Sequence, residues 1–275
     1  MRKGTEQWKH QQLVVVVPAD TPIHRLHPVV KLVGLILLFV PAMAFNHPVW
    51  VGGVLVVAIL LLLTAEGAAN FTRLWGFLLL LFVMSTLLWT FFVQGIEQPD
   101  VVFVIGPLTI ARDAALYGLA MGCRIAALLI LGLVFVTTTR PEDFTYALRR
   151  LGVPATMSVA LTLSFRLLPG FVATVQTVKD AQQARGLQLD RGGVLTRLRR
   201  YFSLAAPVFG YALRQADDLS RALEARGLMA ATRRTELREF SAKWTDVAAL
   251  TFVVLAAAAC VWLRLEGLGE ILPRL

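Results

Sequence analysis

The chain has 275 residues, of which 57% are hydrophobic and only 16% are charged, and its mean hydropathy is +0.66. A soluble chain of this length would expose too much apolar surface, so the composition excludes an ordinary soluble globular protein and predicts an integral membrane protein. The formal net charge is +9, and 17 basic against nine acidic residues between Arg140 and Lys243 carry nearly all of it. Because Lys and Arg collect on the cytoplasmic side of membranes, we expect this block to face the cytoplasm.

Five apolar stretches are candidates for membrane-spanning helices, which need about 20 mostly apolar residues. They are, in chain order, Val29–Phe45, Val49–Leu63, Leu74–Val93, Ala114–Val136 and Trp244–Leu263. The first two are short and share the uncharged turn Asn46-His47-Pro48, which predicts a tight helical hairpin. The expected fold class is therefore an all-α integral membrane protein with about five transmembrane helices.

The charged residues between these stretches indicate the orientation of the chain. Basic residues from Arg2 to Lys31 accompany the start of the first span, and Arg73 lies between the second and third spans. The connection from the third to the fourth span instead contains Glu97 and Asp100. This asymmetry predicts a multi-pass protein of the cell inner membrane with a cytoplasmic N-terminus and an external C-terminus.

Inside the fourth predicted span, Gly118 and Gly122 form a small-xxx-small pair that favours close packing of helices. Arg124 lies in the same span, and Arg166 lies in a later apolar stretch. Since a charged side chain is costly in lipid, we expect both arginines to face protein or water.

The chain divides into three predicted regions. Residues 1–136 hold the N-terminal segment and the first four spans, residues 137–243 form a cytoplasmic region of long helices, and residues 244–275 hold the last span and the tail. Pro141, Glu142 and Asp143 are typical of a helix start, where proline fits and acids interact well with the helix dipole.

Two long helices are expected in the cytoplasmic region. The first runs from Pro154 to Arg185 and is apolar at its beginning and polar after Gln176. At about 1.5 Å per residue it would be roughly 48 Å long. The second runs from about Thr196 to Arg226. Each contains a proline, Pro169 in the first and Pro207 in the second, and these prolines are predicted to kink the helices.

The two long helices end in nearly the same seven residues. Ala181-Gln-Gln-Ala-Arg-Gly-Leu187 closes the first and Ala222-Leu-Glu-Ala-Arg-Gly-Leu228 closes the second, so their arginines lie 41 positions apart. One copy alone is explained by helix capping, because Arg offsets the dipole and Gly adopts the left-handed conformation that ends helices. Two copies favour a second interpretation, in which each narrow, alanine-sided end presents a guanidinium fork to a groove in a two-fold partner. The expected contact residues are Ala184, Arg185, Gly186, Ala225, Arg226 and Gly227.

The chain resembles the EcfT transmembrane components of energy-coupling factor transporters, which include the CbiQ proteins of cobalt and nickel uptake. The resemblance covers most of the chain. It rests on both Ala-Arg-Gly copies and on four further motifs, His24-Arg-Leu-His-Pro-Val-Val-Lys31, Thr138-Thr-Arg-Pro-Glu-Asp143, Leu148-Arg-Arg-Leu-Gly-Val-Pro154 and Ser164-Phe-Arg-Leu-Leu-Pro169. The N-terminal extension up to Val17 is not part of the pattern.

The resemblance implies a non-catalytic scaffold of an ATP-driven importer. It implies that Arg185 and Arg226 end two coupling helices that dock onto two ABC ATPase subunits, and that the apolar parts of these helices hold a separate substrate-binding membrane protein. Selectivity would then lie in that other protein, so vitamins and cobalt or nickel ions both remain open as substrates.

Other functions have less support in the sequence. An ABC-importer permease that lines its own substrate path is the alternative within transport. A membrane enzyme acting on lipids is a further alternative, but the chain shows no paired acids and no Ser/His arrangement to carry out the chemistry. No phosphate-binding Gly-rich loop occurs, so neither ATP nor another cofactor is expected. A metal site at His24 and His27 is conceivable, but a membrane-surface turn is favoured. Nucleic acid is not expected, because the basic block lacks stacking aromatics and anionic lipid headgroups supply the counter-charge.

Overall fold

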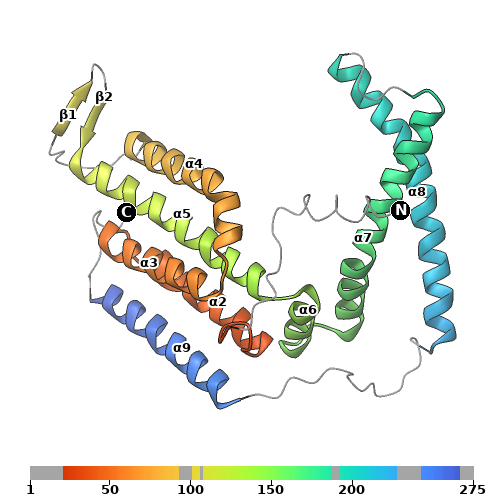
Figure 1. Cartoon of the computed structure of the whole chain (residues 1–275). Helices are drawn as coiled ribbons and strands as arrows, with labels where there is room; N and C mark the ends of the chain where they lie inside the picture. The colour runs from red at the N-terminus through yellow and green to blue at the C-terminus, as the bar shows by residue number, and fades with distance from the viewer. Residues whose placement is uncertain (1–20, 93–100, 106–107, 188–192, 228–242, 267–275) are drawn as a thin grey trace. The chain divides into compact units, whose positions relative to one another are not determined.

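The computed structural model describes residues 21–92, 101–105, 108–187, 193–227 and 243–266, and Figure 1 shows the chain. The N-terminal extension, the connection with Glu97 and Asp100, the segment 188–192 and Leu228, the last residue of the second seven-residue copy, lie outside these ranges. The described helices are α2 (Pro28–Ala44), α3 (Pro48–Thr64), α4 (Ala68–Phe92), α5 (Arg112–Thr138), α6 (Pro141–Arg150), α7 (Ala155–Ala184), α8 (Val194–Ala225) and α9 (Trp244–Leu265).

This helical architecture confirms the predicted all-α membrane fold. One addition was not predicted. The strands β1 (Val101–Ile105) and β2 (Leu108–Ala111) form an antiparallel hairpin in the connection between α4 and α5.

Four of the helices, α4, α5, α7 and α9, are long and apolar enough to cross a membrane by length and composition alone. The shorter apolar helices α2 and α3 have 17 residues each. Both begin with a proline that follows a histidine cap, since the His27 and His47 rings accept hydrogen bonds from the amides of Val29 and Val49. The turn predicted at Asn46-His47-Pro48 lies between them, with Pro48 as the first residue of α3.

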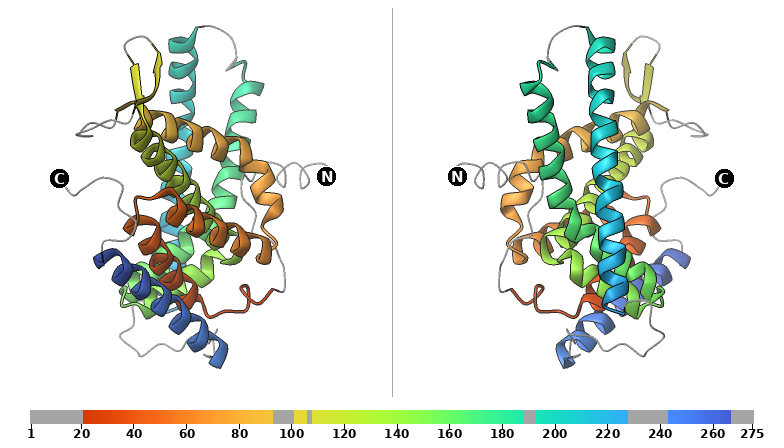
Figure 2. Two further views of the ribbon diagram at one scale, coloured as in Figure 1. Left: turned by 90° about the vertical axis from the view of Figure 1, so that its left-hand side faces the viewer. Right: turned by 90° about the vertical axis from the view of Figure 1, so that its right-hand side faces the viewer.

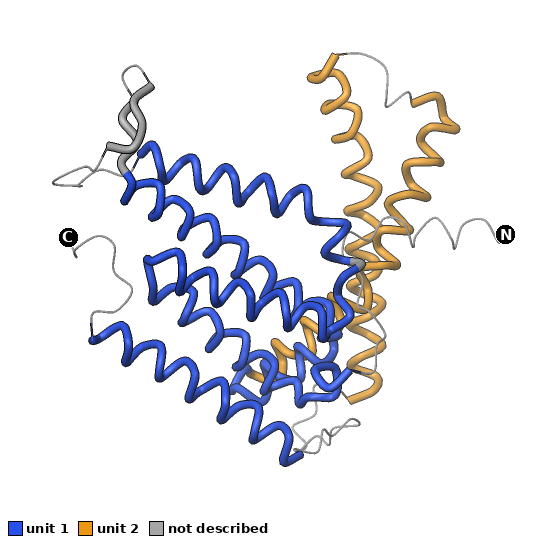
Figure 3. Tube along the Cα trace, turned by 60° about the vertical axis from the view of Figure 1, so that its left-hand side comes forward, with its two compact units in different colours: residues 1–153, 240–275 blue, residues 154–239 orange. Residues whose placement is uncertain are grey.

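The chain forms two compact units, coloured separately in Figure 3. The first comprises residues 1–153 and 240–275, and the second comprises residues 154–239. The second unit is therefore an insertion between α6 and α9 of the first. The predicted division at residues 136 and 243 concerns the membrane boundary and stays a prediction.

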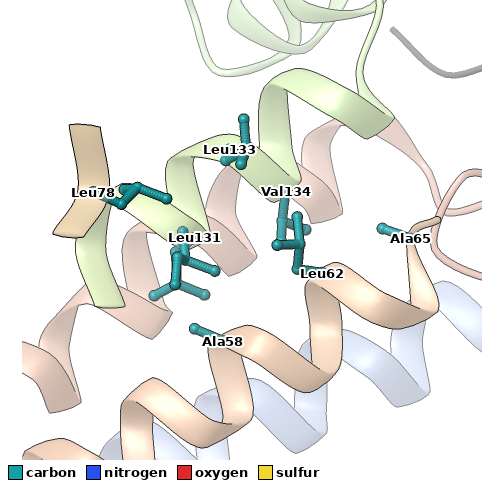
Figure 4. Packing of buried hydrophobic residues seen from close by; sticks show 8 residues of the cluster. Ala58, Leu62, Ala65, Leu78, Leu131, Leu133 and Val134 are labelled. Atoms are coloured by element: carbon teal, nitrogen blue, oxygen red, sulfur yellow. The ribbon is translucent and has the colours of Figure 1, made fainter. Parts of the chain in front are cut away.

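Helix α5 is the central helix of the first unit. It packs against α2, α3 and α4, while α2 also packs against α6 and α9. Half of the apolar 18-residue stretch of α5 is buried, compared with 11% of the corresponding stretches of α4 and α9. Figure 4 shows the core, in which α5 contributes four of the eight buried side chains: Ala58, Leu62, Ala65, Leu78, Ile130, Leu131, Leu133 and Val134.

The glycine pair of α5 brings this helix close to α4, as predicted. A Cβ atom added at Gly118 would lie 2.6 Å from the carbonyl oxygen of Thr86, and one added at Gly122 would lie 3.1 Å from that of Phe82. The hydroxyls of Thr86 and Thr90 on α4 donate to carbonyls of their own helix at 2.8 and 2.7 Å. The contact therefore depends on small residues on one helix and on internally bonded hydroxyls on the other.

Arg124 of α5 faces protein, which confirms the expectation that it avoids lipid. Its Nε donates to the carbonyl of Ala42 at 2.8 Å, and its terminal nitrogens reach the carbonyl of Phe45 and, at 2.9 Å, Oδ1 of Asn46. These carbonyls belong to the last turn and the cap of α2, which have no partner within that helix. Arg124 thus satisfies a helix end from a neighbouring helix.

Large apolar side chains cover the outside of the first unit. The side chains of Val49, Phe92 and Phe252 are 72, 72 and 74% exposed, respectively. Exposed apolar surface of this extent marks contact with lipid or with another protein.

Candidate functional site

The C-terminus of α7 has the geometry of a Schellman cap. Its last helical residue is Ala184, and Arg185 is the C-cap with φ −80° and ψ 7°. Gly186 follows with φ +92°, a conformation that favours glycine. The amide of Gly186 donates to the carbonyl of Gln183 at 2.9 Å, and the amide of Leu187 donates to that of Gln182 at 3.0 Å. Both bonds are those that define the motif.

The C-terminus of α8 has the same geometry as far as Gly227, the last residue described there. Ala225 is its last helical residue, Arg226 is the C-cap with φ −88° and ψ 6°, and Gly227 has φ +70°. The amide of Gly227 donates to the carbonyl of Glu224 at 2.8 Å. The repeated sequence therefore gives a repeated backbone structure, and the capping interpretation of both copies is correct.

Capping does not use the two guanidinium groups. Arg185 and Arg226 are exposed, and neither side chain has a hydrogen-bond partner among the described residues. The alanines one turn before the end, Ala181 and Ala222, are exposed as well, together with Ala184 and Ala225. Each helix thus ends in a narrow face of small side chains, with a guanidinium group that offers five donors at its tip. Such an end is suited to insertion into an acidic or carbonyl-lined groove.

The acidic side chains near the two tips are engaged within their own helices. Gln176 donates to Asp180 at 2.8 Å on α7, and Ser220 donates to Glu224 at 3.3 Å on α8. Each pair joins positions four apart on one helix face. Both arginines consequently remain available to an external anion or carbonyl group.

The two tips lie at opposite ends of a helix pair. Figure 2 shows α7 and α8 side by side and antiparallel, and the two helices pack against each other. A groove of about 380 Å³ between them is lined by residues near the middle of each helix, from Ser164 to Phe171 on α7 and from Tyr211 to Leu219 on α8. Because the helices run in opposite directions, their C-termini point away from this crossing on opposite sides.

Each tip extends beyond the crossing. Arg185 lies 14 positions after Phe171 on α7, which corresponds to roughly 20 Å of helix. Arg226 lies seven positions after Leu219 on α8, roughly 10 Å. Pro169 and Pro207 lie inside these continuous helices and close to the crossing. Whether they bend the helices stays a prediction, although neither proline can donate the usual backbone hydrogen bond.

The motifs at the start of α2 and at the end of α5 meet in the first unit. Lys31 Nζ donates to the carbonyls of His24 at 2.9 Å and of Thr138 at 2.8 Å. The amide of His27 donates to Oδ1 of Asp246, whose Oδ2 accepts from the amide of Lys243 at 2.8 Å. Asp246 is only 3% exposed. Sequence motifs included Lys31 but indicated no partner for it and no role for Asp246, because both make contacts between segments far apart in the chain.

The histidines considered for metal binding have structural partners here. His24 Nδ1 lies 2.7 Å from the hydroxyl of Thr21, and His27 caps α2 and stacks edge-on against Tyr146 of α6 at 5.8 Å. Within the part of the chain that the structure describes, no three His, Cys, Asp or Glu side chains are placed to hold a metal ion together.

The chain is similar in sequence to known membrane transport proteins. The family model for the cobalt transport protein CbiQ matches residues 19–237 of the chain. The energy-coupling factor transporter transmembrane protein EcfT of Thermosediminibacter oceani is 28% identical over 264 residues, which are 90% of this chain and 96% of that protein. EcfT of Staphylococcus aureus is 25% identical over 281 residues, with 91% and 96% covered.

A protein of Bifidobacterium longum, named as an ABC transporter ATP-binding protein, is also similar. It is 32% identical over 256 residues, which are 89% of this chain. The chain spans only 32% of the length of that protein. The similarity therefore covers nearly the whole of one sequence and about a third of the other.

Proposed function

The chain belongs to the CbiQ and EcfT family of transmembrane components of energy-coupling factor transporters, and from this premise we propose that it couples two ABC ATPase subunits to a separate membrane protein that captures the substrate. The observation that carries the proposal is the pair of matched, exposed, arginine-tipped helix ends on α7 and α8.

The antiparallel arrangement supports two partners rather than one. Helix ends that point away from a shared crossing on opposite sides cannot enter a single groove together. They can enter two grooves, one on each subunit of an ATPase pair. The fork of Arg185 and that of Arg226 would each meet carboxylate or carbonyl groups in such a groove, where Arg forms planar, bidentate contacts.

The length of the helices supports transmission of motion between the partners. When the ATPase pair closes on nucleotide, its grooves move, and the seated tips move with them. The tips lie beyond the α7–α8 crossing, so their displacement changes the angle between the two helices. Pro169 and Pro207 are the proposed bending points near this crossing.

The apolar faces of α7 and α8 are the proposed seat of the substrate-binding membrane protein. Met157 and Leu168 on α7 are 60 and 56% exposed, and Phe202 and Phe209 on α8 are 68 and 65% exposed. Side chains of this size favour a protein or lipid partner over water. A change in the helix angle would then reorient the protein held on this face.

In this proposal the chain itself is not an enzyme, and ATP hydrolysis belongs to its partners. The transported molecule, a vitamin or a cobalt or nickel ion, is selected by the substrate-binding protein. The complex lies in the cell inner membrane, with the N-terminus of this chain in the cytoplasm, α7 and α8 on the cytoplasmic side, and the C-terminus outside.

Replacement of the two arginines tests the proposal. Truncating an interface anchor of this kind costs about 2 kcal/mol or more, so Arg185→Ala or Arg226→Ala is expected to weaken ATPase binding about 30-fold, and the double variant to abolish uptake nearly completely. ATPase co-purification and substrate uptake by the whole transporter are the measurements. Arg214→Ala, at an exposed position of α8 away from either tip, is the control. Wild-type assembly and transport by the double variant would refute the proposal.

Subunit stoichiometry separates this function from an ABC-importer permease that lines its own path. One copy of this chain per two ATPases agrees with two contacts on one polypeptide. Two copies per two ATPases would support the permease instead. Native mass spectrometry of the intact complex gives this ratio directly.

A further inference from the structure

The first unit contains an apolar groove that the proposed function does not use. Helices α2, α5 and α9 enclose about 290 Å³ between them, with one wall from α3. Its lining is almost entirely aliphatic and includes Leu35, Leu38, Leu131, Val134, Leu250 and Val253. The one charged side chain in the lining is Lys31, at the α2 N-terminus. An apolar groove of this size beside exposed apolar helix surfaces is suited to a hydrocarbon chain.

Gly34 keeps the floor of this groove open. It lies in the interior of α2, is itself buried and lines the groove. A Cβ added there would meet no heavy atom within 4 Å, so no close helix contact explains the glycine. Glycine within a helix lowers helix stability relative to alanine. What it provides here is space, at the level of the groove where a chain would pass.

A basic rim adjoins the groove at one end. A second hollow, of about 590 Å³, shares Ile23, Leu26 and Ala249 with the groove, and its lining includes the side chains of Arg25 and Lys243. Both of these cations are exposed. The aliphatic groove thus leads to a hollow with two positive charges, and this polarity matches a molecule with an anionic head and an apolar tail.

The neighbouring charges agree with an anionic occupant. Lys31, which lines the groove, directs two of its three donors at the carbonyls of His24 and Thr138. The nearby carboxylate of Asp246 is buried and accepts from two backbone amides, those of His27 and Lys243. Its charge is therefore held by backbone donors at the base of the rim and does not line either hollow.

We propose that this groove binds one anionic phospholipid, with an acyl chain between α2 and α9 and the phosphate between Arg25 and Lys243. Basic hollows between membrane helices on the cytoplasmic side are suited to anionic headgroups. The orientation predicted from the loop charges places this rim on the cytoplasmic side. The inference concerns a lipid that stays with the bundle and is independent of ATPase docking.

Native mass spectrometry of the full-length chain in detergent tests the proposal. The protein is titrated with phosphatidylglycerol and, separately, with phosphatidylcholine of identical acyl chains, and bound lipid is counted. The wild type is expected to prefer phosphatidylglycerol. Because each cation contributes about a fivefold effect near an anionic headgroup, Arg25→Gln with Lys243→Gln should weaken phosphatidylglycerol binding about 25-fold and leave phosphatidylcholine binding unchanged. Arg197→Gln with Arg199→Gln, which removes two exposed charges from α8, is the matched control and should have no effect.

Filling the groove gives a second, independent test. Gly34→Leu should lower the binding of both lipids, whereas Gly53→Leu, the same change at an open and exposed position of α3 outside the groove, should leave both at wild-type levels. Unchanged preference for phosphatidylglycerol in the rim variant overturns the proposal, and this result holds even where Gly34→Leu fails to fold. If Gly34→Leu releases a protein subunit from the purified complex while lipid binding stays unchanged, the groove is a protein-docking surface and the lipid proposal is wrong.

Discussion

Gly186→Ala is expected to damage the presentation of Arg185 without touching the arginine itself. Gly186 has φ +92°, and open space surrounds the position that a Cβ would occupy. The cost of the added methyl group is therefore conformational and not a steric clash with a neighbouring segment. For an L-residue in a left-handed conformation this cost is about 1–2 kcal/mol.

Relaxation of the helix end would not avoid this cost. Leaving the left-handed conformation breaks the bonds from the amides of Gly186 and Leu187 to the carbonyls of Gln183 and Gln182, at 2.9 and 3.0 Å. Each contributes about 0.5–1.5 kcal/mol, so the two routes have similar costs. Either way the cap loses about 1–2 kcal/mol, which corresponds to a 5–30-fold larger open fraction.

Hydrogen exchange at the amide of Leu187 measures this loss. The exchange should be 5–30-fold faster in Gly186→Ala than in the wild type. The control is Gly170→Ala in the same helix, where φ is not positive and a Cβ again meets open space. There alanine is the better helix former, so exchange at Leu187 should stay within twofold of wild type. ATPase binding should fall only in Gly186→Ala. Equal exchange rates in both variants would show that the glycine cap does not fix the tip.

Two further predictions concern the first unit. Arg124→Leu removes three hydrogen bonds from the end of α2 and leaves its carbonyls without a partner, so thermal unfolding of the detergent-solubilised protein should show a loss of about 2–4 kcal/mol of stability. The control is Arg112→Leu, at an exposed position at the start of α5. Equal melting temperatures of the two variants would contradict the role assigned to Arg124. Gly118→Ala should lower the melting temperature, because the added Cβ would lie 2.6 Å from the carbonyl oxygen of Thr86. Gly132→Ala, whose Cβ would meet open space, should leave the melting temperature unchanged or raise it. A lower melting temperature for Gly132→Ala than for Gly118→Ala would mean that α4 and α5 are not held in close contact.

The sequence predicted those features that depend on local chemistry. Proline and two acids at residues 141–143 marked the start of α6, and Arg-Gly marked both tips, because capping rests on residues adjacent in the chain. The five predicted apolar runs correspond to α2, α3, α4, α5 and α9, and their bounds differ from the observed ones by at most six residues, at the start of α4. Helix α7, which is also long and apolar enough to cross a membrane, belongs to the predicted cytoplasmic region. The hairpin of β1 and β2 was not predicted, because residues 101–105 form a short, continuous apolar run without the alternation typical of a half-buried strand.

Contacts between distant segments were beyond prediction. Arg124 was expected to face protein or water, but nothing in its neighbourhood indicates that its partners are Ala42 and Phe45, about 80 positions away. The repeat indicated two tips, yet their opposite directions depend on the antiparallel packing of α7 on α8. Neither the groove beside Gly34 nor its rim follows from periodicity, because both need three helices to be in place.

The bond between His27 and Asp246 joins positions 219 residues apart, so the contacts at the start of α2 are complete only when α9 has been made. On the ribosome the start of α2 is made early, and the inserted pair α7 and α8 emerges before Asp246 exists. A nascent chain therefore carries both arginine ends while its membrane bundle is still incomplete. Synthesis of α9, and not that of the two arginine ends, completes these contacts.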